Sequence, residues 1–136
     1  MIEFIVPGAP RSANANPRSR RRWRERVISA ARDSLLPGIP LADQNLRVIL
    51  IYFYIGETTL DVDNIAKSLL DALKGILFID DGQVSQLTVR KTRVTSGLSL
   101  NGASLLLLGT IDVMSRTGSD FVYVCVDPAP DLSRIP

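Results

Sequence analysis

Apolar residues recur along this chain with two different spacings, one typical of strands and one typical of helices. Residues 46–55 form the longest run of β-branched and aromatic side chains, and the apolar residues in it are nearly continuous. Such a run is typical of a strand that is covered on both faces, so we predict a central strand there. Further strands are predicted for residues 3–6, 84–94 and 121–126.

Helical spacing of apolar residues predicts three helices. Between about residues 19 and 36 the apolar side chains fall on one stripe of a helix. A second helix is predicted from Asp61 or Asp63, either of which can act as its N-cap, to about Gly75. Residues 103–115 are predicted as a short third helix, although periodicity alone does not separate helix from strand in their run of leucines.

These elements together predict a small α/β domain of the α+β type, with about three helices packed on a mixed four-stranded sheet. The chain has 136 residues, enough to bury a core within one domain, and shows no internal repeat. We expect residues 1–126 to form the domain. Residues 127–136 contain three prolines and are expected to form a poorly ordered C-terminal tail.

Histidine is absent from the chain, and Cys125 is its one cysteine. The lack of histidine excludes catalysis by a histidine acid or base, zinc sites with histidine ligands and Ser-His-Asp triads. A single cysteine excludes an internal disulfide, and we expect Cys125 to be a small buried apolar residue. With no basic leader and no apolar stretch long enough for a bilayer, we expect a cytoplasmic protein without a membrane partner.

Acidic residues are concentrated in one short window of a chain whose isoelectric point is about 9.0. Five of the fourteen acids fall between residues 61 and 81, namely Asp61, Asp63, Asp71, Asp80 and Asp81. Carboxylates face phosphate unfavourably unless a cation lies between them. The window therefore suggests a divalent-metal site that faces a polyanion, and phosphodiester chemistry on nucleic acid.

The spacing of these acids is compatible with a metal site built in two parts. In an extended segment Asp61 and Asp63 point to the same side. Asp80 and Asp81 follow a helix of about 18 Å, so they meet the first pair only if the next strand runs back beside residues 46–55. Three carboxylates would then converge to hold Mg²⁺ or Mn²⁺, which would polarise the scissile phosphate and activate a bound water. Helix capping alone would explain one of these acids but not the set.

Lys67 lies one helical turn beyond Asp63, on the same face of the predicted helix. It could contact the phosphate or stabilise negative charge that develops there. The alternative is an ion pair with Asp63 or Asp71, which would contribute only about 0.2–0.5 kcal/mol. For Asp71 itself we favour a solvated ionic partner of Lys67 or Lys74.

Arginine is concentrated near the start of the chain. Seven of the sixteen basic residues lie between residues 11 and 26, and all are arginine: Arg11, Arg18, Arg20, Arg21, Arg22, Arg24 and Arg26. The guanidinium group suits bidentate contacts to phosphate, which give salt-sensitive and sequence-independent affinity. Only Glu25 opposes these charges, so we favour a phosphate-binding face over an ordinary solvated one. Trp23 could stack on a base, but we favour its anchoring the helix to the core.

The acidic window resembles the signature of the RusA-type Holliday junction resolvases. In this chain the signature reads Asp61-Val62-Asp63-Asn64-x-x-Lys67-x-x-x-Asp71-Ala72-Leu73-x-Gly75-x4-Asp80-Asp81-x-Gln83-Val84. The segment Pro10-x-Ser12-x-Asn14 is similar to the loop after that family's first strand. The closing strand, from Asp120 to Val124, looks like the family's last strand.

The resemblance implies a RusA-like homodimer that resolves four-way DNA junctions in recombination and repair by paired, Mg²⁺-dependent incisions, with no small-molecule cofactor. By position, Asp61, Asp63 and Asp81 would be the catalytic metal-binding acids. Asp80 would support them in holding the metal, and Lys67 would be the catalytic lysine. We assign DNA binding to Asn14 and to the seven arginines. Some family members have a basic run directly before the first Asp, where this chain has Gly-Glu-Thr-Thr-Leu at residues 56–60.

Three alternatives remain open from the sequence. A phosphatase or phosphotransferase of the Asp-x-Asp-x-Thr type would need Asp61 at a strand end and a Thr at position 65, where this chain has Ile65. A non-catalytic DNA-binding module would use the arginines alone and leave the acids without a role. An inactive relative of the resolvases would keep the acids without cleaving DNA.

Overall fold

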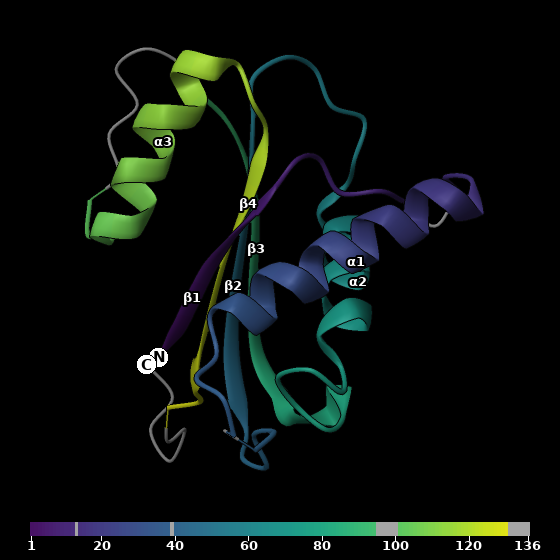
Figure 1. Cartoon of the computed structure of the whole chain (residues 1–136), viewed down its shortest axis with the longest axis vertical. Helices are drawn as coiled ribbons and strands as arrows, with labels where there is room; N and C mark the ends of the chain where they lie inside the picture. The colour runs from purple at the N-terminus through teal and green to yellow at the C-terminus, as the bar shows by residue number, and fades with distance from the viewer. Residues whose placement is uncertain (13, 39, 95–100, 131–136) are drawn as a thin grey trace.

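Four strands of this protein form a single mixed sheet, and three helices pack against it (Figure 1). The computed structural model describes residues 1–12, 14–38, 40–94 and 101–130. In chain order the elements are β1 (Ile2–Pro7), α1 (Pro17–Asp33), β2 (Leu46–Tyr54), α2 (Val62–Leu73), the short 3-10 helix η1 (Asp81–Gln83), β3 (Val84–Arg93), α3 (Leu105–Thr117) and β4 (Phe121–Pro128). The predicted α+β domain with a mixed four-stranded sheet and three helices is confirmed.

The strand order across the sheet is β1-β4-β2-β3. β4 pairs antiparallel with both β1 and β2. β2 pairs parallel with β3, with Val48 opposite Leu87 and Tyr54 opposite Arg93. The predicted central position of β2 is therefore confirmed, and β3 forms one edge of the sheet.

Helices cover the two faces of the sheet unequally (Figure 1). α1 and α2 lie on one face, and α3 lies on the other. Under α1 and α2, alternate β2 side chains such as Val48 and Leu50 pack into the larger core with Val27 and Leu69, all of them fully buried. Alternation of this kind follows from the period of two in a strand and of about 3.6 in a helix.

The smaller core, under α3, is rich in aromatic residues. Phe53 and Phe121 stack there with their ring centroids 4.8 Å apart, and Leu107 of α3 packs against the same cluster. Cys125 belongs to it and is 6% exposed, as expected for a small apolar residue. Burial raises the pKa of the Cys125 thiol, and the nearby carboxylate of Asp127 raises it further, which disfavours the reactive thiolate.

α1 starts two residues before the predicted position and ends three residues earlier. The side chain of Asn16 accepts a hydrogen bond from the backbone N–H of Ser19 at 2.8 Å, and Pro17 occupies the first helical position. At the other end the Ser34 N–H donates to the carbonyl of Ala31 at 3.1 Å. The helix therefore stops at a capping serine rather than at the Pro-Gly pair that follows.

β4 extends to Pro128, two residues into the segment predicted as a tail. Asp127 lies opposite Arg47 of β2, and a guanidinium nitrogen of Arg47 donates to Asp127 Oδ2 at 3.1 Å. The backbone N–H of Ala129 then donates to the carbonyl of Asn45 at 2.9 Å. Residues 131–136 of the predicted tail lie outside the described residues. Among the residues the structure describes, no helix is long and apolar enough to cross a membrane.

Candidate functional site

Asp61 and Asp63 stand at the N-terminus of α2, and both are exposed. Asp61 occupies the N-cap position with an extended backbone, but its carboxylate accepts no capping hydrogen bond. Asp63 lies in the first turn. Capping therefore does not occupy the Asp61 carboxylate, and the positive end of the helix macrodipole favours negative charge at this place.

The loop that leads to Asp61 is held at both ends by side chains that are distant in the sequence. Lys91 of β3 donates from Nζ to the carbonyl of Leu60 at 3.0 Å, directly before Asp61. At the start of the loop, the Ile55 N–H donates to Asp120 Oδ1 at 2.9 Å. These two contacts fix where the first acid of the pair lies.

Asp120 also connects three strand ends. The Tyr52 hydroxyl donates to Asp120 Oδ2 at 2.7 Å, and the Gly8 N–H donates to the Asp120 carbonyl at 2.8 Å. Tyr52 is 2% exposed. Burial raises the pKa of Tyr52 well above its usual range, and the Asp120 carboxylate raises it further. Sequence reasoning missed this pair, although a tyrosine inside a buried strand signals that its hydroxyl needs a partner.

The Asp80 carboxylate stabilises the turn before β3. Its carboxylate accepts from the Gly82 N–H at 3.1 Å and forms an ion pair with Lys74 Nζ at 3.5 Å. The hydrogen bond from Gly82 lowers the pKa of Asp80, and Lys74 lowers it further. The structural role of Asp80 is thus local, and its predicted part in holding a metal stays a prediction.

Gln83, another residue of the signature, fastens the same turn. Its Oε1 accepts from the N–H groups of Ile79 and Asp80 at 2.7 and 2.9 Å, and its Nε2 donates to the Ala42 carbonyl at 2.7 Å. Asp81 follows Asp80 in η1 and is exposed. Asp81 makes no ion pair within the described part of the chain, so its carboxylate is available.

The two acidic clusters lie at opposite ends of α2. Asp61 occupies the N-cap position at the start of the helix, whereas Lys74 at its end contacts Asp80. Twelve helical residues separate the ends by about 18 Å. β3 does run beside β2 as anticipated, but the two strands are parallel. β3 therefore begins at the same end of the sheet as β2, which is the end opposite Asp61.

The expected convergence of three carboxylates is therefore not met within one chain. Residues 1–12, 14–38, 40–94 and 101–130 contain no group of three His, Cys, Asp or Glu side chains placed to hold a metal ion. What one chain supplies is the pair Asp61 and Asp63 at one end of α2, and Asp81 with Asp80 at the other. A site with three carboxylates would need acids from two chains.

Lys67 is exposed on α2, one turn from Asp63, and forms no ion pair with any described residue. The alternative, an ion pair of Lys67 with Asp63 or Asp71, is therefore absent from the described residues. The expected partnership of Asp71 with Lys67 or Lys74 is wrong as well, because Lys74 pairs with Asp80 instead. The Lys67 ammonium is thus free to contact an anion.

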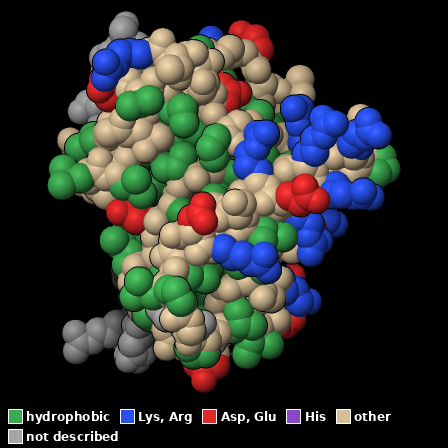
Figure 2. All heavy atoms as spheres, viewed as in Figure 1, with side chains coloured by type: hydrophobic (Ala, Val, Ile, Leu, Met, Phe, Trp, Pro, Cys, Tyr) green, Lys and Arg blue, Asp and Glu red, His purple; other side chains and the backbone are tan. Residues whose placement is uncertain are grey.

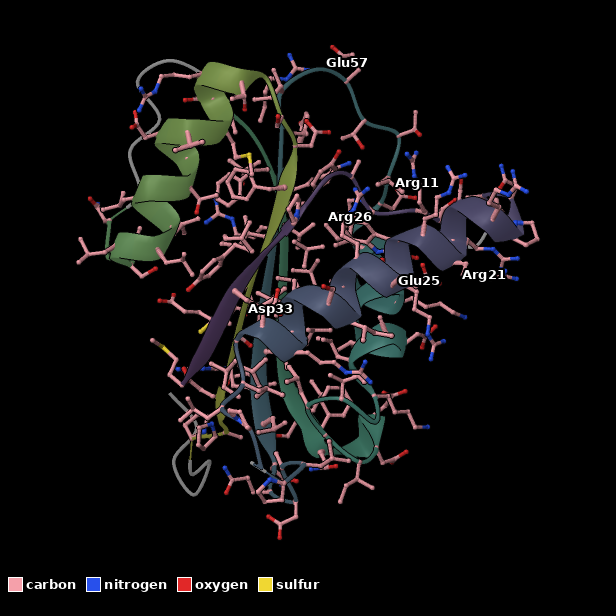
Figure 3. All side chains as sticks on the ribbon, viewed as in Figure 1. Arg11, Arg21, Glu25, Arg26, Asp33 and Glu57 are labelled. Atoms are coloured by element: carbon pink, nitrogen blue, oxygen red, sulfur yellow. The ribbon has the colours of Figure 1, made fainter. Side chains whose placement is uncertain are left out.

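The seven arginines between residues 11 and 26, here called the arginine block, lie on the N-terminal half of α1 and just before it. Lys and Arg side chains gather there in Figure 2. The six helical members of the block, Arg18, Arg20, Arg21, Arg22, Arg24 and Arg26, are all exposed. Figure 3 shows Arg21 and Arg26 extending from the helix beside Glu25. Arg26 also has a structural role, because its Nη1 donates to the Pro7 carbonyl at 3.1 Å. Asn14 is exposed in the turn just before α1, and its N–H donates to Ser12 Oγ at 3.3 Å.

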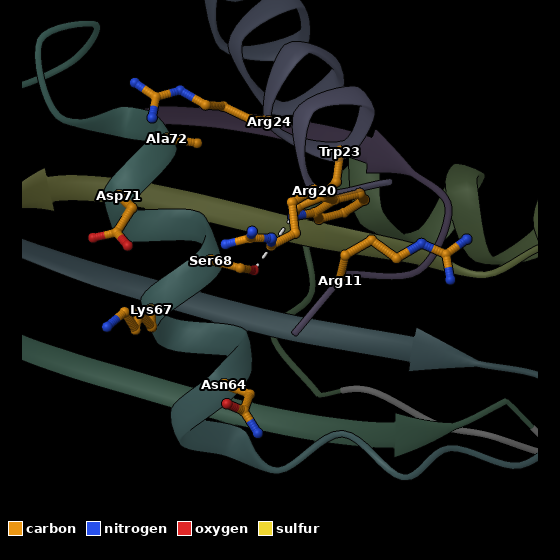
Figure 4. Close-up of a pocket in the computed structure, with 9 residues that line it drawn as sticks. All are labelled: Arg11, Arg20, Trp23, Arg24, Asn64, Lys67, Ser68, Asp71 and Ala72. Atoms are coloured by element: carbon orange, nitrogen blue, oxygen red, sulfur yellow. Dashed lines mark hydrogen bonds between the residues drawn. The ribbon is translucent and has the colours of Figure 1, made fainter. Parts of the chain in front are cut away.

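A cleft of about 200 Å³ between α1 and α2 joins part of the arginine block to Lys67 (Figure 4). Arg11, Arg20 and Arg24 line it on one side, and Lys67 lines it on the other. Trp23 is 4% exposed and forms part of the cleft wall, with its Nε1 donating to Ser68 Oγ at 3.3 Å. The expected role of Trp23 as an anchor of α1 is confirmed.

The position of Asp61 also bears on the phosphatase alternative. β2 ends at Tyr54, and Asp61 stands at the cap of a helix rather than at the end of a strand. The nucleophile of an Asp-x-Asp-x-Thr site would therefore be misplaced.

One family model agrees with the signature. The model described as Endodeoxyribonuclease RusA matches residues 9–98, which is about two thirds of the chain. The matched segment spans α1, β2, α2 and β3, and so contains the whole acidic window. No curated protein matches the chain.

Proposed function

The chain belongs to the RusA family of endodeoxyribonucleases, and on this premise we propose that it is a homodimeric, Mg²⁺-dependent enzyme that resolves four-way DNA junctions in recombination and repair. The observation that carries the proposal is the exposed pair of carboxylates at the start of α2, beside a helix whose N-terminal half exposes six arginines. In the proposal the enzyme acts in the cytoplasm.

The donor atoms suit a hard divalent cation. Asp61 and Asp63 offer carboxylate oxygens, which Mg²⁺ and Mn²⁺ prefer to nitrogen or sulfur ligands. A bound Mg²⁺ would supply a Lewis acid and a water of lowered pKa to a chain without histidine. Lys67, one turn along the same helix, neutralises charge on the phosphate, and the arginines hold the neighbouring backbone.

A second copy of the chain completes the site in this proposal. β3 is an edge strand, and most of its side chains are exposed. Unpaired strand edges are suited to pairing with another chain, and a two-fold axis pairs identical edges antiparallel. In such a pair, the β3 strands of the two copies run in opposite directions. Because α2 packs on β3, the reversal brings the start of α2 in one copy toward η1 of the other.

In the assembled dimer, Asp61 and Asp63 of one chain therefore face Asp81 of the partner subunit. Two equivalent sites arise from one axis, which suits the near-symmetry of a four-way junction and the paired nicks that resolve it. The arrangement explains why the acids of one signature lie about 18 Å apart in a single chain.

An inactive DNA-binding relative is the second candidate, and it is favoured by the absence of a three-carboxylate group from the described residues of one chain. A cleavage assay separates the two. A four-way junction, a flap and a linear duplex are each incubated with Mg²⁺ or with EDTA. Nicking that requires Mg²⁺ and prefers the junction supports the resolvase, whereas junction binding without cleavage in any metal supports the inactive relative.

A further inference from the structure

We propose that the cleft between α1 and α2 is a binding site for one phosphodiester group of a DNA strand, so that the strand is held there before it reaches the acids. The inference rests on the proposed function for the direction of the strand. The binding itself depends only on the residues that line the cleft (Figure 4).

The charge of the cleft selects an anion. Arg11, Arg20, Arg24 and Lys67 line it, and Asp71 is the one acid among the lining residues. None of these five side chains forms an ion pair with another described residue. The cleft thus has four cationic side chains, from three separate segments, and one opposing carboxylate. A phosphate oxygen can reach these cations from the solvent.

The size of the cleft selects part of a polymer rather than a whole small molecule. Its volume of about 200 Å³ is below the roughly 300–1,000 Å³ of pockets that enclose a drug-sized ligand. It would hold about six or seven waters at about 30 Å³ each. Trp23 and Ala72 give it a buried apolar wall, against which a sugar ring can pack while the phosphate contacts the cations.

The position of the cleft gives the strand a direction. Lys67 and Asn64 line it from α2, and Asn64 is adjacent to Asp63 in the first turn of the same helix. A strand whose phosphate lies between Arg20 and Lys67 therefore continues along α2 toward the Asp61 and Asp63 carboxylates. The cleft thus links the arginine block to the proposed catalytic end of α2.

Trp23 provides a direct measurement, because it is the single tryptophan of the chain and lies in the cleft wall. Its fluorescence is followed while the full-length protein is titrated with a short oligothymidylate in EDTA, where cleavage does not interfere. A saturating change of intensity or wavelength is expected. A titration that leaves the fluorescence unaltered, under conditions where anisotropy shows the oligonucleotide bound, would overturn the proposal.

Matched variants test which side chains hold the phosphate. Arg20→Gln and Lys67→Gln should each weaken the fluorescence-detected affinity by about fivefold to twentyfold. Arg32→Gln removes the same charge from the last turn of α1, away from the cleft, and should change affinity by less than about twofold. Asp71→Asn removes the opposing carboxylate and should tighten binding by about twofold to fivefold. Equal losses in Arg20→Gln and Arg32→Gln would refute a localised site.

Two further arms identify the ligand and separate this inference from the enzyme assignment. Inorganic phosphate should compete only weakly, and saturation by phosphate below about 1 mM would mean a free-anion site instead of a strand site. If junctions are not cleaved but the Trp23 titration behaves as described, the proposed function fails and the cleft stands. If junctions are cleaved and Arg20→Gln and Lys67→Gln bind the oligonucleotide as the unmodified protein does, the cleft fails and the function stands.

Discussion

Neutralising Arg20, Arg21 and Arg22 together should weaken junction binding and make it less sensitive to salt. The three side chains are consecutive, exposed and without an ion pair in the part of the chain that the structure describes. Glutamine at these positions therefore removes charge without breaking a contact that holds α1 on the core. α1 remains fastened by buried residues such as Trp23 and Val27.

The size of the effect follows from counterion release. Each phosphate that a protein neutralises on duplex DNA contributes about −0.9 to the slope of log K against log salt. Three contacts contribute about −2.7, so between about 50 and 200 mM salt they account for a roughly 40-fold fall in affinity. The triple variant should lose that part of the salt dependence and keep the part due to Arg11, Arg18, Arg24 and Lys67.

The assay is fluorescence anisotropy of a labelled four-way junction in EDTA at several salt concentrations. A control variant neutralises Arg32, in the last turn of α1, and Arg116, which pairs with Asp112 on α3. The control should keep the slope of the unmodified protein. An unchanged slope in the triple variant would remove the arginine block from the interface, and an equal change in the control would reduce its role to net charge.

Three further predictions concern Asp63, the hydrogen bond between Tyr52 and Asp120, and the turn at Gly8. Asp63→Asn should abolish cleavage while junction binding persists, and cleavage at the unmodified rate in Mg²⁺ would show that the site is misassigned. Tyr52→Phe should lower the free energy of unfolding at neutral pH by about 2 kcal/mol, because it removes a hydrogen bond to the Asp120 carboxylate. Because the pKa of Tyr52 is raised in the folded protein, its hydroxyl ionises at lower pH in the unfolded chain than in the folded one. The free energy of unfolding should therefore fall as pH rises above about 10. Denaturant titrations should find a smaller fall of this free energy with pH in Tyr52→Phe. Gly8→Ala should lower Tm, because Gly8 has φ +101° and an added Cβ would overlap the Arg26 guanidinium that binds the Pro7 carbonyl; an unchanged Tm would contradict this.

Local sequence patterns predicted the secondary structure well because the side chains that become buried recur along the chain with the period of a strand or a helix. The β-branched run at β2 and the stripe of Trp23, Val27 and Ala31 on α1 both correspond to side chains that are buried. The ends of the elements were less well predicted. The Asn16-Pro17 pair is a helix-start signal, although the predicted helix begins only at about residue 19. The extension of β4 depends on the pairing of Asp127 with Arg47 from a distant strand.

The candidate site was predicted in its chemistry but not in its geometry. The sequence placed Asp61, Asp63 and Lys67 on one end and one face of a helix, since these relations are local. It placed Asp81 beyond the far end of that helix, but it could not place Asp81 relative to Asp61 and Asp63, because that depends on how β3 pairs with β2. The contact between Lys91 and the loop before Asp61 is a tertiary relation of the same kind.

A dimer with two different subunits tests the shared site most directly. One subunit carries Asp63→Asn, the other carries Asp81→Asn, and different affinity tags allow the mixed dimer to be isolated after co-production. If each site takes Asp61 and Asp63 from one chain and Asp81 from the other, the mixed dimer keeps one intact site and one doubly altered site. It should therefore nick a four-way junction in Mg²⁺ at up to about half the rate of the unmodified dimer, while both altered homodimers are inactive. A mixed dimer as inactive as the two homodimers would contradict a site shared between chains.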